Sequence, residues 1–320
     1  MSSKSSRGPG ARGLLFLGFA GMAWGGMLPV GKLLFQHLDP IVMTALRYGF
    51  AALLFLAALV WREGWAALRP QRRGLRLWLL GTVGFAGFNL LGFEGLEHTQ
   101  PEQAAVMVAL MPLVTAMVQW LLQGQRPAKA TLWAIGLALA GVLLVLSGGS
   151  MSRLLHGGGV RGDLMVLAGA LCWVGYTLGA RSFPGWSPLR YTALSCAPGA
   201  LSIAAIALAG MAGGYLRVPT GADLHAAAWG LAYLVVVAAF LAVLGWNAGI
   251  ARVGATTGVL FINLVPVTAF GVGALSGQHF GAAELLGAAL VMAALVLNSV
   301  FAALGARAAA LRACAYCFGV

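Results

Sequence analysis

The chain carries one apolar pattern twice. The stretch AGMAWGGMLPVGK, which contains Trp24 and ends at Lys32, returns as GALCWVGYTLGAR, which contains Trp173 and ends at Arg181. Both pairs of residues stand 149 positions apart (173 minus 24, and 181 minus 32). A duplicated, apolar chain is typical of transporters built from two halves, whose substrate site lies where the halves meet.

The composition is that of a chain in contact with lipid. Hydrophobic residues make up 60% of it and charged residues 9%, with a mean hydropathy of +0.89, whereas about 25% of the residues of a soluble domain are charged. The net charge of +12 also suits a nucleic-acid partner, but the basic residues sit in short loops beside apolar spans. We therefore expect a polytopic membrane protein in a lipid bilayer, with no nucleic-acid partner and no separate soluble domain.

Ten segments are apolar enough to span a membrane, which takes about 20 residues each. They predict an all-α membrane protein of ten transmembrane helices. Because five is odd, two similar sets of five cross the membrane in opposite directions and form inverted five-helix repeats. We place the repeats at 13–148 and 162–304, between tails at 1–12 and 305–320. The ten segments are Leu14–Phe35, Ile41–Trp61, Leu77–Gly95, Ala104–Leu122, Leu132–Leu146, Leu164–Phe183, Tyr191–Met211, Ala226–Ile250, Thr256–Leu275 and Leu285–Leu304.

The positive charges predict the orientation. With the N-terminus inside, fifteen of the 20 Lys and Arg residues fall in inside loops or tails, and only Arg153, Arg161 and Arg217 fall outside. The other two, Lys32 and Arg47, lie within or at the ends of spans. Cytoplasmic loops carry such an excess of Lys and Arg, so we expect both termini to be cytoplasmic.

Two prolines occupy matching places in spans four and nine. Pro112 lies in LMPLVTA and Pro266 in LVPVTAF, 154 positions apart (266 minus 112). Proline removes a backbone hydrogen bond and kinks a helix. The kinks either serve packing alone or form hinges that face a cavity, as kinked helices commonly do in transporters; we take both prolines as candidate hinges.

Several polar residues fall inside the predicted spans, where each costs a few kcal/mol unless it is paired or hydrated. The candidates for a substrate site are Arg47, Asn89, Glu94, Asn247 and Asn263. Arg47 either extends to the outer headgroups or has a functional role. In that role it is a cation in the cavity or forms an ion pair with Glu94. Glu94 is either a proton site or a carboxylate in the hydrated outer rim.

Aromatic residues supply a further set of candidates. Trp24 and Trp173 occupy equivalent positions well inside spans one and six, and Met27 and Tyr176 each follow three residues later on the same helix face. Trp246 lies in span eight. These side chains belong either to an interfacial aromatic belt or to the wall of a cavity for apolar, aromatic or cationic solutes.

Motifs for other activities are missing. The sequence has no G-x-x-x-x-G-K-[ST] loop, no H-E-x-x-H and no G-x-S-x-G. The four cysteines do not suggest a disulfide framework, and the C-x-x-C of Cys314 and Cys317 lacks the second Cys or His pair of a metal site. We expect no cofactor, no metal site and no enzymatic activity.

Long stretches of the chain resemble the drug/metabolite transporter superfamily, in particular its EamA branch. The resemblance covers about Gly13–Leu304. It rests on AGMAWGG around Trp24, DPIVMTALRYGFAALL around Arg47, LMPLVTAMVQWLLQGQRPAKATLWAIGLALAGVLLV after the first proline, and NLVPVTAFGVGALSGQHFGAAELLGAALVMAAL around the second. Relatives typically have an acidic residue in the loop before spans five and ten. Gln125 and Gln278 stand at those places here.

The resemblance implies a basket of helices around a central cavity, with spans five and ten toward the periphery. It also implies transport of small organic solutes such as amino acids, amines or metabolites, often outward. Together with the repeat, it predicts a secondary transporter of the bacterial inner membrane. We expect an exporter of amino acids or related metabolites, with alternating access at the interface of the repeats, a proton as candidate coupling ion, and a monomeric or homodimeric state.

Two rival functions remain open at this stage. A membrane-embedded enzyme acting on a lipid-like substrate would need clustered acidic or histidine side chains, and Glu94, Glu97, His98 and Glu102 are the nearest approach to such a cluster. A non-transporting membrane scaffold would have a sealed, dry centre.

Overall fold

The computed structural model describes residues 9–124, 126–150, 159–254, 258 and 261–317. Within these ranges all regular structure is helical. The first half of the chain contains α1 (Pro9–Leu34), α2 (Pro40–Glu63), η1 (Trp65–Leu68), α3 (Gly74–Gly81), η2 (Thr82–Gly87), α4 (Phe88–Glu97), α5 (Pro101–Ala109), α6 (Met111–Gln123) and α7 (Lys129–Ser147).

The second half repeats this order. Its elements are α9 (Gly159–Gly179), η3 (Ala180–Ser182), α10 (Pro188–Ala212), α11 (Gly221–Ala232), η4 (Tyr233–Leu241), α12 (Ala242–Val253), η5 (Phe261–Asn263), α14 (Leu264–Leu275) and α15 (Ala282–Cys317). Both η2 and η4 are π-helical and join two α-helices into one span, which runs over Gly74–Glu97 in one half and Gly221–Val253 in the other.

The described ranges contain eight helices that are long and apolar enough to cross a membrane. Helices α5 and α6, which bend by 41° at their junction, make a ninth span if the pair crosses the membrane as one unit. The ninth predicted segment, Thr256–Leu275, contains a shorter apolar helix, Phe261–Leu275, and begins in residues outside the described ranges. The structure therefore supports a multi-pass membrane protein, while the predicted count of ten spanning helices is not confirmed.

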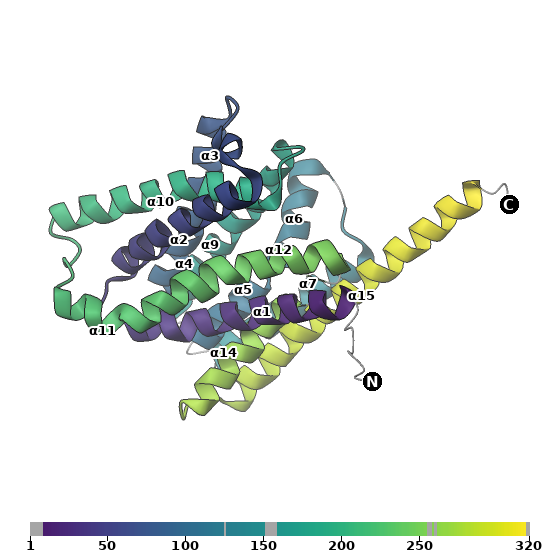
Figure 1. Cartoon of the computed structure of the whole chain (residues 1–320). Coiled ribbons are helices and arrows are strands. Elements are labelled where there is room, and N and C mark those ends of the chain that lie inside the picture. The colour runs from purple at the N-terminus through teal and green to yellow at the C-terminus, as the bar shows by residue number, and fades with distance from the viewer. Residues whose placement is uncertain (1–8, 125, 151–158, 255–257, 259–260, 318–320) are drawn as a thin grey trace, which may run out of the picture.

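The two terminal segments differ from the predicted tails. Helix α1 begins at Pro9, within the predicted N-terminal tail, and residues 1–8 lie outside the described ranges. Helix α15 continues through the predicted C-terminal tail to Cys317 and projects from the bundle (Figure 1). The side chains of Cys314 and Cys317 are not described, nor are Gln125 and Arg153.

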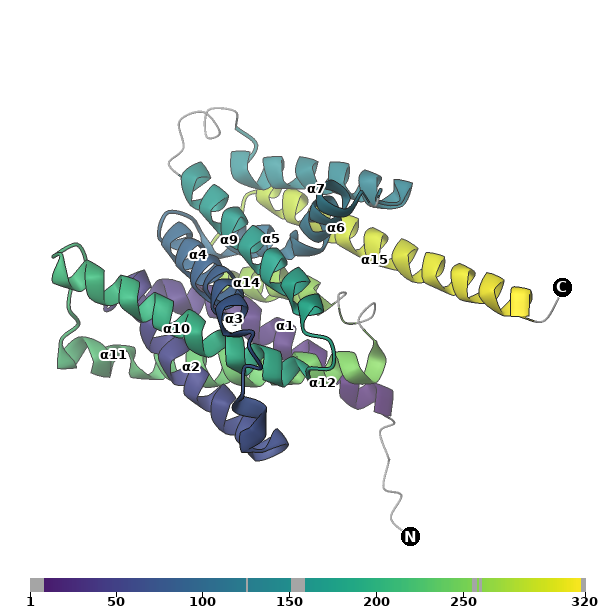
Figure 2. The same ribbon diagram turned by 90° about the horizontal axis from the view of Figure 1, so that it is seen from above.

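Contacts between the halves follow a two-fold pattern. Helix α1 packs against α12 and α14, and its counterpart α9 packs against α4, α5 and α6. Helices α2 and α10 lie side by side, as do α7 and α15 (Figures 1 and 2). The contact of α1 with α12 thus corresponds to that of α9 with α4, and the α2–α10 and α7–α15 pairs each join two equivalent helices. This pattern is consistent with two related repeats.

The crossing of α7 and α15 depends on two glycines that face each other. A Cβ atom at Gly141 would lie 2.7 Å from the carbonyl oxygen of Gly287, and one at Gly287 would lie 2.6 Å from that of Gly141. Helices in lipid associate mainly through such close packing of small residues. The small-residue segments GLALAG of α7, which ends at Gly141, and GAALVMAAL of α15, which begins at Gly287, therefore meet where these two helices cross.

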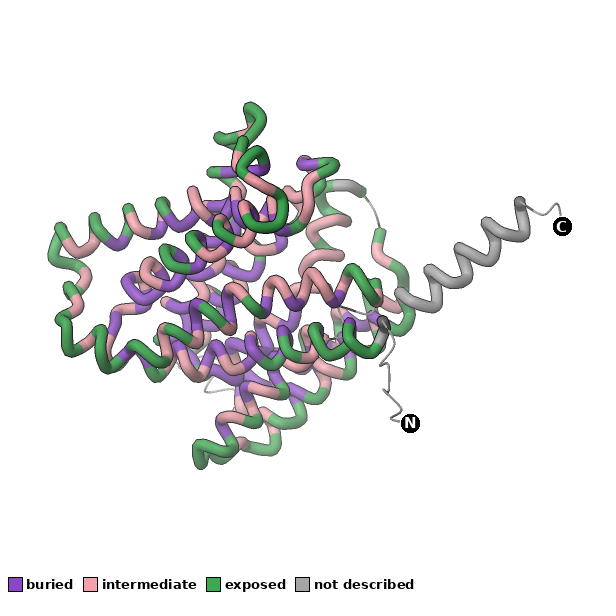
Figure 3. The backbone as a smooth tube through the Cα atoms, viewed as in Figure 1, coloured by how far each residue is buried: buried purple, intermediate pink, exposed green. Residues whose placement is uncertain are grey.

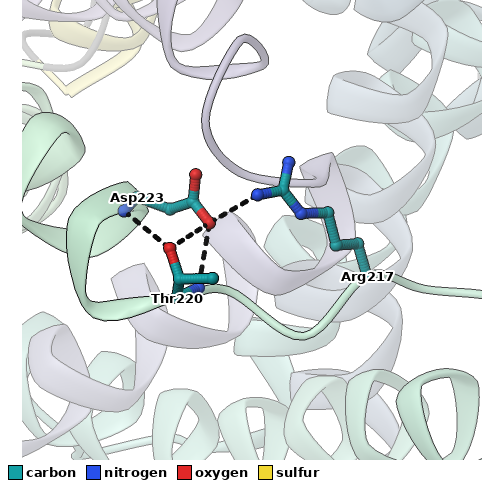
Figure 4. Close-up of polar contacts among 3 residues, drawn as sticks. All are labelled: Arg217, Thr220 and Asp223. Atoms are coloured by element: carbon teal, nitrogen blue, oxygen red, sulfur yellow. Dashed lines mark hydrogen bonds and ion pairs between the residues drawn. The ribbon is translucent and has the colours of Figure 1, made fainter.

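Polar side chains begin some of the helices. Asp39 accepts a hydrogen bond from the Ile41 amide at 2.9 Å at the start of α2, where Pro40 occupies a position that needs no N–H donor. At the start of α11, Thr220 and Asp223 form a reciprocal capping box, and Arg217 lies 2.8 Å from the Asp223 carboxylate (Figure 4). These caps satisfy amide groups that the first helical turn leaves unpaired.

Buried residues concentrate along the middle of the bundle (Figure 3). Large apolar side chains also cover its outside; Leu201 on α10 is 70% exposed and Leu275 on α14 is 91% exposed. An apolar exterior of this kind suits hydrocarbon and not water.

Candidate functional site

Two adjoining cavities lie between the two halves of the bundle. The smaller has a volume of about 80 Å³ and the larger about 620 Å³. The larger extends to the loop that joins α9 to α10, where Phe183, Trp186 and Pro188 contribute to its lining. The side chains common to both cavities come from both halves of the chain: Trp24, Phe85, Met111, Trp173, Val243 and Ile262.

Arg47 on α2 lines the smaller cavity and is only 2% exposed. Its Nη1 donates to Oδ1 of Asn89 at 3.2 Å, and its Nη2 donates to the Met27 sulfur at 2.9 Å. The guanidinium also lies 4.9 Å from the centre of the Tyr48 ring and 5.5 Å from that of Phe93. Sequence analysis named Arg47, Asn89 and Met27 as site residues, and the fold brings these three together.

The π-helical segments supply carbonyl oxygens to this site. Nε of Arg47 donates to the Leu234 carbonyl in η4 at 3.2 Å, and the Trp24 indole donates to the Ala238 carbonyl at 3.0 Å. In η2, the carbonyl of Phe85 accepts from the Asn89 amide at 2.9 Å. A π-helix widens the turn and disturbs the regular i to i−4 bonding. Exposed carbonyls at membrane depth are tolerated where they face a cavity or another polar group.

No carboxylate among the described residues pairs with Arg47. The ion pair described in this chain joins Arg217 to Asp223, and neither cavity lining contains Asp or Glu. An arginine at the centre of a membrane helix costs about 2.5–3.5 kcal/mol or more. The neutral partners of Arg47 offset only part of that cost, since a thioether is a weak acceptor.

Trp24 and Trp173 both line the two cavities, one from each half. Their surroundings differ, however. Trp24 packs against Trp246 with ring centres 5.1 Å apart, and its indole N–H donates to the Ala238 carbonyl in η4. Trp173 lies among Phe85, Phe88 and Tyr176, and its indole N–H has no acceptor among the described residues.

The wall of the larger cavity contains further residues that the sequence pointed to. Tyr176, Trp246, Asn247 and Pro112 all line it. The Tyr176 hydroxyl lies 3.0 Å from that of Ser195 on α10. This cavity is therefore mainly aromatic and apolar, with hydroxyl and amide groups at a few points.

Two other predicted residues lie beside the cavities without lining them. Asn263 is 6% exposed and its Oδ1 has no hydrogen-bond partner. Pro266 is the third residue of α14, and Pro112 is the second residue of α6. Both prolines thus stand in the first turn of an α-helix. Pro112 directly follows the 41° bend between α5 and α6, whereas Pro266 lies within the apolar helix Phe261–Leu275. A hinge at either proline stays a prediction.

At the end of the bundle away from the large cavity, Lys32 links α1 to the end of α4. The Nζ atom of Lys32 donates to the carbonyls of Leu96, Glu97 and Thr99, at 2.6, 3.1 and 2.5 Å, at the C-terminal end of α4. The Thr99 hydroxyl donates to Asp163 on α9 at 2.6 Å. A cation at the C-terminus of a helix is favoured by the helix dipole, so this cluster ties α1, α4 and α9 together.

Glu94 lies away from Arg47. Its carboxylate forms a cluster with Glu97 and His98, in which one potential metal-ligand atom of each residue lies within 4.8 Å of the others. Glu97 and His98 are exposed. Glu102 lies apart from them in a third cavity of about 230 Å³, which also contains Gln278, His279 and Glu284. The predicted pairing of Glu94 with Arg47 is not present in the structure.

A family model decides the broader identity of the chain. The model described as the EamA-like transporter family matches residues 11–147 and 160–300. The chain belongs to this family. Both matched segments coincide with the two halves seen in the helix contacts, so the cavities of this EamA protein lie between its two family repeats.

Known proteins agree with the EamA assignment. The chain is 29% identical to the uncharacterized transporter YrdR of Bacillus subtilis over 91% of this chain and 93% of that protein. It is 30% identical to the uncharacterized transporter YyaM of Bacillus subtilis over 87% and 90% of the two chains. A solved structure described as a crystal structure of protein aligns with a TM-score of 0.63 at 23% identity and covers 91% of this chain and 98% of its own; it supports the fold.

Some site residues of this EamA protein were missed by sequence analysis. Tyr48 follows Arg47 directly, and its hydroxyl donates to the Asn89 amide oxygen at 3.2 Å. Phe85 stands between two glycines in TVGFAG and contacts both Tyr48 and Trp173. Lys32 was noted only as the end of a repeated pattern. Its position at the end of span one was the available signal, but its carbonyl partners depend on where α4 ends.

Proposed function

We propose that this EamA protein is a secondary transporter of small organic solutes that works by alternating access in the bacterial inner membrane. It exports amino acids or related metabolites. The observation that carries the proposal is the large cavity between the repeats, which reaches Trp24 and Trp173 from one end of the bundle. At the other end Lys32 binds carbonyls at the end of α4, and we take this contact as the seal of that end. A solute site between two repeats, accessible from one side, is the arrangement that alternating access requires.

The seal is asymmetric between the repeats, which supports this mechanism. Arg181 stands at the position equivalent to Lys32, but it is exposed and has no hydrogen bond or ion pair among the described residues. The C-terminal end of α12 is equivalent to the C-terminal end of α4. Ile250, near the end of α12, lines the large cavity. In the opposite state, Arg181 would bind the carbonyls at the end of α12 while Lys32 leaves α4.

The orientation follows from the distribution of basic residues. Because both termini are proposed to be cytoplasmic, the loop between α9 and α10 is also cytoplasmic, and the large cavity opens inward. An inward-facing cavity loads solute from the cytoplasm, as an exporter requires.

The test is solute flux in proteoliposomes. Pools of amino acids, amines, carboxylic acids and other metabolites are screened for counterflow, with and without an imposed proton gradient. We expect counterflow with at least one pool; acceleration by the gradient would assign the proton as coupling ion, and indifference to it would assign uniport or exchange. Absence of flux from every pool with folded protein would overturn the proposal.

Two matched variants connect flux to the cavity. Thr177 lines the large cavity and Leu201 faces outward from α10. Thr177→Trp is expected to reduce flux at least about 10-fold because the indole fills the passage. Leu201→Trp adds an indole of the same size on the exposed surface and is expected to transport normally. Equal flux in both variants would place the solute path elsewhere.

A further inference from the structure

We propose that the small cavity binds the carboxylate of an organic acid through Arg47, while the aromatic side chains around it hold the apolar body of that acid. The inference rests on the proposed function only in taking the occupant to be the transported solute. Among amino acids and related metabolites, it selects the organic acids that lack an ammonium group and carry an aromatic or comparably apolar group.

The donors of Arg47 are only partly used. Guanidinium has five N–H groups in a planar fork, and three of its nitrogens each make one bond, to Leu234, Asn89 and Met27. One N–H on each terminal nitrogen is left, and the side chain lines the cavity. This fork matches the two oxygens of a carboxylate. A bound anion would also supply the counter-charge that the described protein residues lack.

The walls suit an apolar body. Trp24, Phe85, Phe88 and Trp173 surround the small cavity, and the larger one continues past the two tryptophans. A cavity of about 150 Å³ holds a benzene molecule, so the small cavity of about 80 Å³ fits a carboxylate and its first carbons. A ring would then lie between Trp24 and Trp173, where the cavities meet.

The same lining disfavours cations. Neither cavity has an Asp or Glu side chain among its lining residues, and the cation that is present already contacts the Tyr48 and Phe93 rings. An amine would therefore meet a like charge at Arg47 and no opposite one. The carboxylate of a zwitterionic amino acid could bind Arg47, but the ammonium group of that amino acid would contact only aromatic rings.

Three ligands with one benzyl group separate these cases. Phenylacetate is an anion at pH 7, phenylalanine a zwitterion and phenethylamine a cation. Binding is measured from the quenching of indole fluorescence in purified protein in lipid nanodiscs. We expect phenylacetate to bind at least about 10-fold more tightly than phenethylamine, with phenylalanine between them. This comparison uses the unaltered protein, so it does not depend on the folding of a variant.

Variants of Arg47 assign the effect to that side chain. Arg47→Gln is expected to weaken phenylacetate binding by about 10- to 100-fold and to abolish the preference for the anion. Arg47→Lys keeps the charge without the fork and is expected to show an intermediate loss. Arg217→Gln removes the same charge from a side chain that is 68% exposed at the start of α11 and is expected to bind phenylacetate normally.

Failure of this inference is distinguishable from failure of the proposed function. Equal or tighter binding of phenethylamine, or unchanged phenylacetate affinity in Arg47→Gln, would overturn the anion site, even if flux of other solutes establishes transport. Anion-selective binding that depends on Arg47, without flux of any solute, would instead overturn the transport proposal. The anion-binding site at Arg47 would then stand without a transport function.

Discussion

The amide oxygen of Asn89 accepts two hydrogen bonds, one from Nη1 of Arg47 and one from the Tyr48 hydroxyl, each at 3.2 Å. The Asn89 amide nitrogen donates in turn to the Phe85 carbonyl in the π-helical segment η2. The buried guanidinium is thus held by a neutral amide oxygen and not by a carboxylate. Arg47 is oriented by this contact but keeps its charge uncompensated by the described protein groups.

Replacement of Asn89 by Asp places a counter-ion against Arg47 with almost no change in shape. The new carboxylate would compete with a bound anion, because a buried charge binds its nearest partner most strongly. We expect Asn89→Asp to weaken phenylacetate binding at least about 10-fold while thermal stability is kept or raised. Fluorescence titration and thermal unfolding measure both quantities. Unchanged anion affinity would contradict a role for the free charge of Arg47.

The two equivalent tryptophans are expected to respond differently to the same substitution. Trp24→Phe removes a partly buried hydrogen bond to the Ala238 carbonyl and is expected to cost about 0.5–1.5 kcal/mol, the usual net contribution of such a bond. Trp173→Phe removes an N–H without a partner, so it loses only ring contacts with its aromatic neighbours and is expected to cost less stability than Trp24→Phe. Chemical or thermal unfolding in detergent tests this. Equal losses would mean that the hydrogen bond of Trp24 carries no net free energy.

Lys32→Met is expected to loosen the sealed end of the bundle. The substitution removes three charge-assisted hydrogen bonds to the end of α4, each worth about 1.5–3 kcal/mol when buried. The readout is maleimide labelling of a cysteine placed at Leu96, which is fully buried at this seal, in a background without the native cysteines. We expect labelling at least about 10-fold faster than in the parent.

Lys32→Arg is the matched variant for this measurement, because arginine keeps the charge and can still donate to the same carbonyls. Its labelling rate should stay close to that of the parent. A Lys32→Met protein that labels no faster than the parent would show that Lys32 does not hold this end closed.

The α7 and α15 crossing offers a test of packing with an internal control. Gly141→Leu would push a side chain against the backbone of α15 at Gly287 and is expected to cost at least about 1–3 kcal/mol. Gly136 lies on the exposed face of the same helix with nothing near its Cβ position. Gly136→Leu should therefore be tolerated. Similar losses of thermal stability in the two variants would mean that the glycine contact does not support the bundle.

Sequence alone predicted the features that depend on local pattern and duplication. The repeated WxxM and WxxY segments place Trp24 and Trp173 at matching depths, and both reach the same cavities. The apolar runs locate most spans.

Features that depend on helix rotation and on backbone irregularity were not predictable. Glu94 follows Asn89 by five residues, and at 100° per residue it points about 140° away from the face that meets Arg47. Phe93, four residues after Asn89, lies on that face and contacts the guanidinium. No residue type marks η2 or η4 as π-helical, so the carbonyls that bind Arg47 and Trp24 could not be foreseen.

Two measurements on proteoliposomes together test the account most directly. One is uptake of labelled phenylacetate. The other is the current produced by a phenylacetate concentration jump on proteoliposomes adsorbed to a solid-supported membrane. The account predicts uptake that is lost in Arg47→Gln and Thr177→Trp and retained in Leu201→Trp. A current with the sign of negative charge moving inward accompanies it in uniport, and its absence beside uptake assigns electroneutral exchange or proton coupling. Neither current nor uptake above protein-free vesicles, from protein that still binds phenylacetate in nanodiscs, would contradict transport of an organic anion through this site.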